Sequence, residues 1–166
     1  MSRIVVCDTG PLIHLSEAEA LFLLKPAGDV LIPPAVADEF KRNLPKGKMP
    51  DWIYVHPLQE QTKSQAMSWV DNHDIDIGEA EAIGLALQQQ SNWLLTDDAE
   101  ARQFAEGLGL EVHGSIGLLL WAIAVGHVES REQAYQRLNG LKRSSLWISE
   151  RVLTEAMQAI DQLTLE

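Results

Sequence analysis

Short apolar runs alternate with amphipathic stretches along the chain, a pattern that predicts strands followed by helices. The first run, Ile4–Cys7, is apolar at every position, as is typical of a strand buried on both faces of a sheet. Strands are expected at Ile4–Cys7, Val30–Ile32, Trp52–Val55, Trp93–Leu95 and Leu110–Val112. Helical surface is expected from Leu12 to Leu24 with a polar interruption at Ser16 and Glu17, and helices at Ala35–Asn43, Thr62–His73, Ile77–Gln90, Ala99–Leu108, Ile116–Val125, Arg131–Leu141 and Glu150–Leu163.

Strands that alternate with helices specify a parallel sheet covered by helices on both faces. We therefore expect an α/β fold with three layers, α/β/α, and a central parallel sheet of four to five strands. A single domain over residues 1–166 is expected, because no Ser- or Gly-rich linker divides the chain, and residues 115–166 form its helical C-terminal part. In such a sheet the ligand site lies beyond the carboxyl ends of the strands.

The composition is that of a globular protein, with 46% hydrophobic and 22% charged residues. Its longest apolar stretch, Ile116–Val125, is about ten residues long, whereas a bilayer-spanning helix needs roughly 20. We therefore expect no membrane association, and an apolar helix there that belongs to the core or to a homodimer interface. The N-terminus lacks the pattern of a signal peptide, and the single cysteine, Cys7, lies in a buried strand. These features predict a cytoplasmic protein.

Acidic residues stand where the predicted strands end. Asp8 follows the first strand and the pair Asp97 and Asp98 follows the fourth, so all three are expected at one edge of the sheet. Glu39 and Glu81 lie on neighbouring helices that could lean toward that edge. Each acid alone has a structural explanation, because an Asp at such a position often caps the next helix.

Together these carboxylates suit metal-assisted hydrolysis of a phosphodiester. Mg²⁺ and Mn²⁺ prefer carboxylate oxygens, and they supply both charge neutralisation and an activated water. Several carboxylates crowded in one site repel each other, a cost that a bound cation offsets. The histidines show no spacing typical of a zinc site. The formal net charge of −11 argues against a nucleic-acid partner, although bound metal offsets part of it locally.

Four motifs, in order, resemble those of the PIN-domain family. The sequence VCDTGPLI at Val6–Ile13 resembles the opening motif, a strand that ends in Asp followed by Thr or Ser. Ile32–Phe40 resembles the second motif, in which a helix carries Glu39 into the site. Gly78–Ala86 resembles the acidic helix of the third motif, and Leu94–Asp98 the strand and terminal acid of the fourth. The motifs span residues 4 to about 114, and they look closest to a prokaryotic subfamily related to VapC-type toxin ribonucleases.

The resemblance implies which acids bind metal. Asp8, Glu39 and one acid from each of the last two motifs would be ligands, directly or through water. In the third motif the helix pattern favours Glu81 and leaves Glu79 to pair with Asp76 in a capping box, with Glu79 as the alternative. In the fourth motif the threonine–any–acid spacing favours Asp98, with Asp97 as the alternative.

Two threonines and the number of ions complete the expected site. Thr9 and Thr96 would provide hydroxyls that hydrogen-bond the ligands or water. No acid follows Val112–Gly114, where some family members carry one more, which leaves one or two metal ions open.

The expected function is that of a Mg²⁺- or Mn²⁺-dependent endoribonuclease with Asp8, Glu39, Glu81 and Asp98 as catalytic residues. By the resemblance it would be the toxin of a toxin–antitoxin pair, with RNA as substrate and a small antitoxin protein as partner. Two alternatives stay open at this point: a PIN-like binding or regulatory module that no longer cleaves, and a metal-dependent phosphohydrolase of small phosphoesters.

Overall fold

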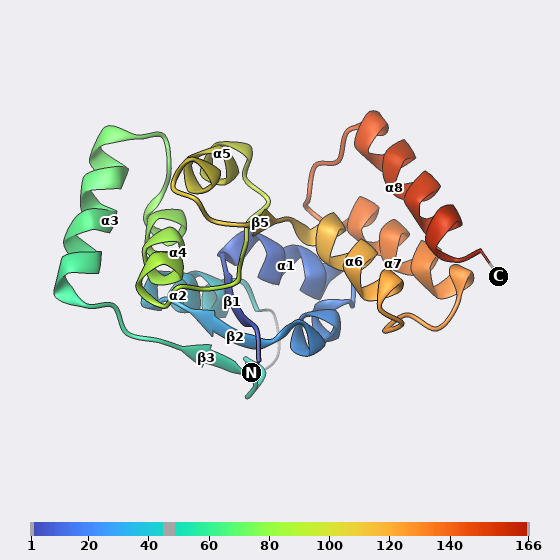
Figure 1. The fold of residues 1–166 in the computed structure, drawn as a ribbon, viewed down its shortest axis with the longest axis horizontal. Coiled ribbons are helices and arrows are strands. Elements are labelled where there is room, and N and C mark those ends of the chain that lie inside the picture. The colour runs from blue at the N-terminus through green and yellow to red at the C-terminus, as the bar shows by residue number, and fades with distance from the viewer. Residues whose placement is uncertain (1, 45–48, 166) are drawn as a thin grey trace.

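A five-stranded parallel sheet forms the centre of the protein in a computed structural model that describes residues 2–44 and 49–165 (Figure 1). The strand order is β3–β2–β1–β4–β5, and every neighbouring pair is parallel. The strands are β1 Ile4–Cys7, β2 Asp29–Ile32, β3 Ile53–Val55, β4 Trp93–Leu95 and β5 Val112–His113. The expected parallel sheet is therefore confirmed, with five strands.

The order of the strands reverses beside β1. From β1 the chain proceeds outward to β2 and β3, then returns to the other side of β1 to form β4 and β5. Val6 of β1 lies in register with Leu31 of β2 and with Leu94 of β4. In an open parallel sheet such a reversal leaves a crevice at the carboxyl ends of the two strands that flank it. Asp8 follows β1 and Asp97 follows β4 closely, so both acids stand at that crevice.

Helices cover the sheet to give a three-layer α/β/α arrangement. Helix α4 packs against β1 and β4 and also contacts α2 and α3. Helices α6, α7 and α8 pack on one another, and α6 and α7 also contact α1 (Figure 1). The helices are α1 Thr9–Glu17, α2 Pro34–Asn43, α3 Glu60–Asn72, α4 Ile77–Gln88, α5 Ala99–Gly107, α6 Ser115–Ala124, α7 Arg131–Arg143 and α8 Glu150–Leu163, with a 3₁₀ helix η1 at Leu21–Ala27.

Two elements differ from the sequence prediction. The apolar segment that begins at Leu21 forms η1 rather than part of an α-helix. Pro26 lacks the N–H that a further helical hydrogen bond needs, and Gly28 (φ 154°), in a conformation that favours glycine, ends the segment. Strand β5 pairs through Val112 and His113, whereas Leu110–Val112 was expected. The shift brings the end of β5 to Gly114, directly before α6.

The apolar helix α6 belongs to the core. Leu118, Leu119, Ala122 and Ile123 are buried, and α7 and α8 pack against the helix. None of the helices in the described part of the chain combines the length and the apolar character that a bilayer span requires.

Candidate active site

An acidic cavity of about 510 Å³ opens at the carboxyl ends of β1 and β4. Side chains from both halves of the sheet and from the loop between α7 and α8 line it. Its carboxylates belong to Asp8, Glu39, Asp76, Glu79, Asp97 and Asp98. The remaining lining residues are Thr9, Gly10, His14, Ala99, Leu146 and Trp147. The topology thus brings together acids that are up to 90 positions apart in the chain.

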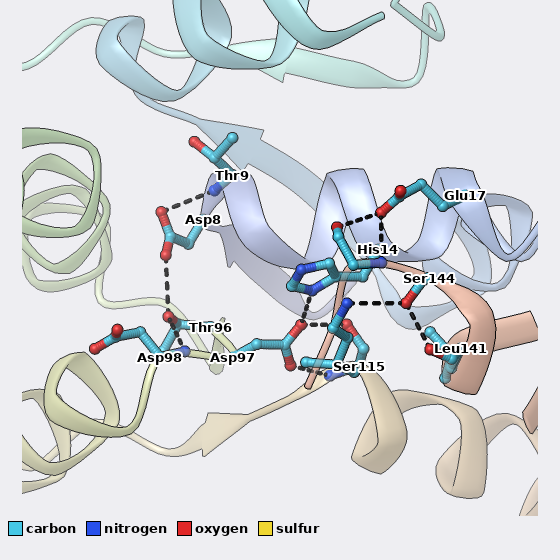
Figure 2. Close-up of polar contacts among 12 residues, drawn as sticks. Asp8, Thr9, His14, Glu17, Thr96, Asp97, Asp98, Ser115, Leu141 and Ser144 are labelled. Carbon is cyan, nitrogen blue, oxygen red and sulfur yellow. Dashed lines mark hydrogen bonds and ion pairs between the residues drawn. The ribbon is translucent and has the colours of Figure 1, made fainter. Parts of the chain in front are cut away.

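Asp8 is buried at the floor of the cavity and held by two hydrogen bonds. The Thr9 backbone N–H donates to Oδ1 (2.8 Å) and the Thr96 hydroxyl donates to Oδ2 (3.0 Å), so Asp8 also caps α1 (Figure 2). Burial raises the pKa of Asp8 to about 7, an effect opposed by these hydrogen bonds and reinforced by the charges of Asp76 and Glu39. Asp8 is therefore a fixed carboxyl group that forms no ion pair with the described residues.

The Thr9 hydroxyl is buried without a partner. Thr9 lines the cavity and is 7% exposed, yet its Oγ1 has no hydrogen-bond partner among the described residues. A buried hydroxyl without a partner costs about 1–3 kcal/mol, so such a group usually faces a ligand or a water. The hydrogen-bonding capacity of the Thr9 hydroxyl is thus left unused by the described residues.

Asp97 and Asp98 point in opposite directions from the end of β4 (Figure 2). Asp97 accepts hydrogen bonds from Nδ1 of His14 (2.7 Å) and from the backbone N–H (2.7 Å) and hydroxyl (2.6 Å) of Ser115. Burial alone would raise the pKa of Asp97, but these hydrogen bonds hold it below its usual value. Asp97 therefore links α1, β4 and the start of α6.

Asp98 is exposed and has one oxygen engaged. Its Oδ1 accepts from the backbone N–H of Ala101 (2.9 Å), which makes it the N-cap of α5. Among the described residues, no hydrogen bond is formed by its Oδ2. The capping role expected for one acid of this pair is confirmed for Asp98, and capping leaves an oxygen that can face the cavity.

Glu39 of α2 lies over the first turn of α4. A Cβ at Gly78 would stand 2.5 Å from Oε1 of Glu39, so the carboxylate occupies the space that any other residue would fill. Gly78 is the second residue of α4, where backbone N–H groups point outward and favour an anion. The close approach of α2 to α4 therefore places the Glu39 carboxylate at the cavity.

Glu79 serves in the capping box and lines the cavity as well. The Asp76 side chain accepts from the Glu79 N–H (2.8 Å), and Glu79 Oε1 accepts from the Asp76 N–H (2.9 Å). Burial raises the pKa of Glu79 to about 8, helped by the nearby charges of Asp76, Asp8 and Asp98. Capping and lining are thus compatible roles for one carboxylate.

Glu81 lies elsewhere. It is not among the residues that line the cavity, and its Oε1 accepts from the backbone N–H of Ala35 in the first turn of α2 (3.0 Å). Two residues along a helix are separated by about 200° around its axis, so Glu79 and Glu81 face different neighbours. Whether either acid binds metal stays a prediction.

Two titratable residues of the cavity, Asp76 and His14, were not singled out as site residues in the sequence, and neither was Trp147. Asp76 was expected only as a capping residue, although its place directly before the third motif was a signal for it. His14 was considered only as a zinc ligand, and its position on the helix that begins at Asp8 could have indicated that it lies near the site.

The carboxylates share the cavity without forming a closed cluster. Within residues 2–44 and 49–165, no three His, Cys, Asp or Glu side chains meet closely enough, as they stand, to hold an ion together. The residues that line the cavity nevertheless suit a hard cation, because most of its polar side chains are carboxylates. Burial, reinforced by the charges of neighbouring acids, raises the pKa values of Asp8 and Glu79, and a bound cation would offset this cost.

The parallel sheet and the acidic cavity at its reversal point define a three-layer α/β fold with carboxylates gathered at the carboxyl ends of β1 and β4. A family model described as a PIN domain matches residues 4–162, and the chain therefore belongs to the PIN-domain family. PIN domains are generally nucleases that act on nucleic acid and use divalent metal ions, so this is a nuclease-type fold. No curated protein matches the chain significantly.

Proposed function

We propose that this protein is a Mg²⁺- or Mn²⁺-dependent endoribonuclease whose active site is the acidic cavity. The observation that carries the proposal is the gathering of carboxylates from four separate segments of the chain in one cavity. A bound divalent ion supplies positive charge for the phosphate and promotes ionisation of the attacking water. Hydrolysis of a phosphodiester needs both.

Four acids are proposed to hold the ion: Asp8, Glu39, Glu79 and Asp98. Each lines the cavity and has at least one oxygen that is not fully engaged by the chain. Thr96 orients Asp8 by donating to its Oδ2, and Thr9 offers its hydroxyl to the ion or to water.

Asp97 and Glu81 are assigned positioning roles within this proposal. The three hydrogen bonds of Asp97 to His14 and Ser115 favour a structural task at the junction of β4 and α6. The bond from Ala35 to Glu81 favours a role in fixing the start of α2, the helix that carries Glu39.

The test is cleavage of single-stranded RNA by the purified protein. We expect activity with Mg²⁺ or Mn²⁺, none in EDTA, and a loss of about two orders of magnitude or more in Asp8→Asn, because an orienting contact alone is typically worth 10- to 100-fold. Asp38→Asn is the control, since Asp38 is exposed on α2 beside Glu39. Equal activity in EDTA, or in Asp8→Asn, would contradict the proposal.

The variants Glu79→Gln and Glu81→Gln test which acid of α4 contributes to activity. Both changes remove one charge from the same helix, but only Glu79 lines the cavity. We expect Glu79→Gln to lose most of the activity and Glu81→Gln to keep it, because the amide oxygen of Gln can still accept from Ala35. The reverse result would assign the ligand to Glu81.

A binding module that does not cleave is the second candidate, and the formal net charge of −11 favours it. Binding of RNA without cleavage in the presence of either metal would select it. The role as the toxin of a toxin–antitoxin pair rests on the resemblance alone and stays a prediction. Growth arrest on expression of the wild type but not of Asp8→Asn would support it.

A further inference from the structure

The indole of Trp147 stands in solvent on a firmly anchored loop. Trp147 is 83% exposed, whereas its neighbours Leu146 and Ile148 pack against the core. The Ser145 N–H and hydroxyl both donate to Glu17 Oε1 (3.1 and 2.5 Å), and Ser149 caps α8. The backbone on both sides of Trp147 is therefore fixed, and the ring is held outward by a folded segment.

This ring lies where two cavities meet. The acidic cavity and a second cavity of about 270 Å³ are both lined by Asp97, Ala99, Leu146 and Trp147. Anything bound against the indole is thus adjacent to the carboxylates.

The second cavity has a different chemical character from the first. Apolar side chains line much of it, and Gly114 and Gly117 expose backbone there. Arg102 is the cation that lines it, and its guanidinium lies 3.1 Å from where a Cβ of Gly114 would stand. Arg102 forms no ion pair within the described residues. A flat aromatic ring, apolar walls, the Asp97 carboxylate and a guanidinium with no ion pair among the described residues therefore surround one space.

These groups suit a nucleotide whose base is not paired. An exposed indole stacks on any base, each contact being worth about 1–3 kcal/mol, whereas a base inside a duplex has no free face. A guanidinium binds phosphate oxygens in a fixed planar geometry. Since a protein of net charge −11 gains little from general attraction to phosphates, stacking provides affinity that does not depend on charge.

We propose that this second cavity binds one nucleotide of a single-stranded RNA, with its base stacked on Trp147 and its phosphate at Arg102. The inference rests on the proposed function and adds that the substrate is unpaired beside the cleaved bond. Trp147 then positions the strand so that the next phosphate enters the acidic cavity.

The test compares three fluorescent probes of equal length and charge: oligoadenylate, oligouridylate and an abasic ribose-phosphate chain. Binding is measured by anisotropy with Ca²⁺ present, a hard cation with the same preference for oxygen ligands. We expect Trp147→Ala to weaken oligoadenylate binding by about 5- to 100-fold and abasic-chain binding not at all, which follows from the stacking energy. Trp147→Phe should keep most of the affinity, and oligouridylate should lose less than oligoadenylate.

Tyr54→Ala is the matched control, because Tyr54 is another exposed aromatic side chain and lies on β3, away from both cavities. Equal affinity of Trp147→Ala and wild type for oligoadenylate would overturn the inference, as would an equal loss for the abasic chain. Cleavage is followed separately with Mg²⁺. RNA cleavage that Trp147→Ala leaves unchanged in rate and KM overturns only the base site, whereas base-dependent binding without cleavage overturns only the nuclease.

Discussion

Asp8 and Glu79 are two carboxyl groups whose environment opposes their charge. Burial and neighbouring acids raise the pKa of Asp8 to about 7 and that of Glu79 to about 8. Asp97 stands at the same strand edge, but donors from His14 and Ser115 lower its pKa. Near neutral pH and without a cation, the first two acids are partly protonated while Asp97 is ionised.

The free energy of unfolding should therefore depend on pH in EDTA. Because the pKa of Asp8 in the folded chain lies above its ordinary value of 3.8, this group stabilises the fold below that value and loses the contribution as pH rises to about 7. Asp8→Asn removes the penalty, so we expect it to raise stability at pH 8 by at most about 4 kcal/mol and to change little at pH 4. Urea unfolding at the two pH values measures the difference.

Mg²⁺ provides the complementary measurement. It should raise the stability of the wild type most at pH 8, where the carboxylates are ionised, and should have a smaller effect on Asp8→Asn. If Asp8→Asn is less stable than the wild type at pH 8 in EDTA, the buried charge is not the dominant effect.

The sequence predicted the position of each acidic motif, but it left open which of two nearby acids, Glu79 or Glu81 and Asp97 or Asp98, belongs to the site. Asp8 could be identified because it ends a continuous apolar run, and the capping box of Asp76 and Glu79 because of its spacing. The faces of α4 are decided by contacts with α2, which no local pattern contains. For the same reason, the sequence could not decide that Asp97 points to His14 and Asp98 toward α5.

Helices α2 and α4 form the part of the site most sensitive to spacing. Glu39 reaches the cavity only because Gly78 leaves room for its carboxylate. An added methyl group would stand 2.5 Å from Oε1, so the Glu39 side chain would have to move.

Gly78→Ala should therefore damage the site more than the fold. We expect it to weaken the binding of Mn²⁺ by about 10- to 100-fold, as is typical when a ligand loses its support, with a small change in melting temperature. Calorimetric titration measures the affinity. Gly107→Ala is the control, because nothing lies within 4 Å of the added Cβ and alanine favours the helical state by up to about 1 kcal/mol. Equal metal affinity in both variants would refute this role of Gly78.

The elements themselves were largely predictable, because buried strands and amphipathic helices differ in period. Strand β1, the start of α4 and the limits of α8 follow from apolar periodicity and caps. The predicted position of β5 differs from the observed one because a two-residue strand carries almost no periodic signal. The sequence could not predict that the two cavities share lining residues, because this depends on how the loop between α7 and α8 packs on α1.

At the scale of the whole molecule, the protein has a formal net charge of −11, and six carboxylates line its cavity. RNA approaches such a surface against electrostatic repulsion. The proposed ion has to offset that repulsion where the phosphate enters.

RNA binding itself should therefore need a divalent ion. We expect EDTA to abolish oligonucleotide binding, and the dependence of log K on log salt, measured with Mg²⁺, to be shallower than a slope of about −3, which corresponds to roughly four phosphate contacts. Anisotropy over a range of KCl concentrations measures both. Tight binding in EDTA with a steep slope would instead indicate a basic surface and contradict the central role of the cavity.

Helix α1 joins the two walls of the proposed substrate path. Asp8 caps its beginning, and Glu17 at its end receives both hydrogen bonds from Ser145, two residues before Trp147. Nine residues of α-helix are about 13 Å long and do not stretch, so this short rod fixes the spacing between acid and indole. The fixed distance between Asp8 and Trp147 would then select the substrate. An RNA whose stacked base and cleaved phosphate are further apart would not fit, and no closing motion of the protein would be needed to exclude it.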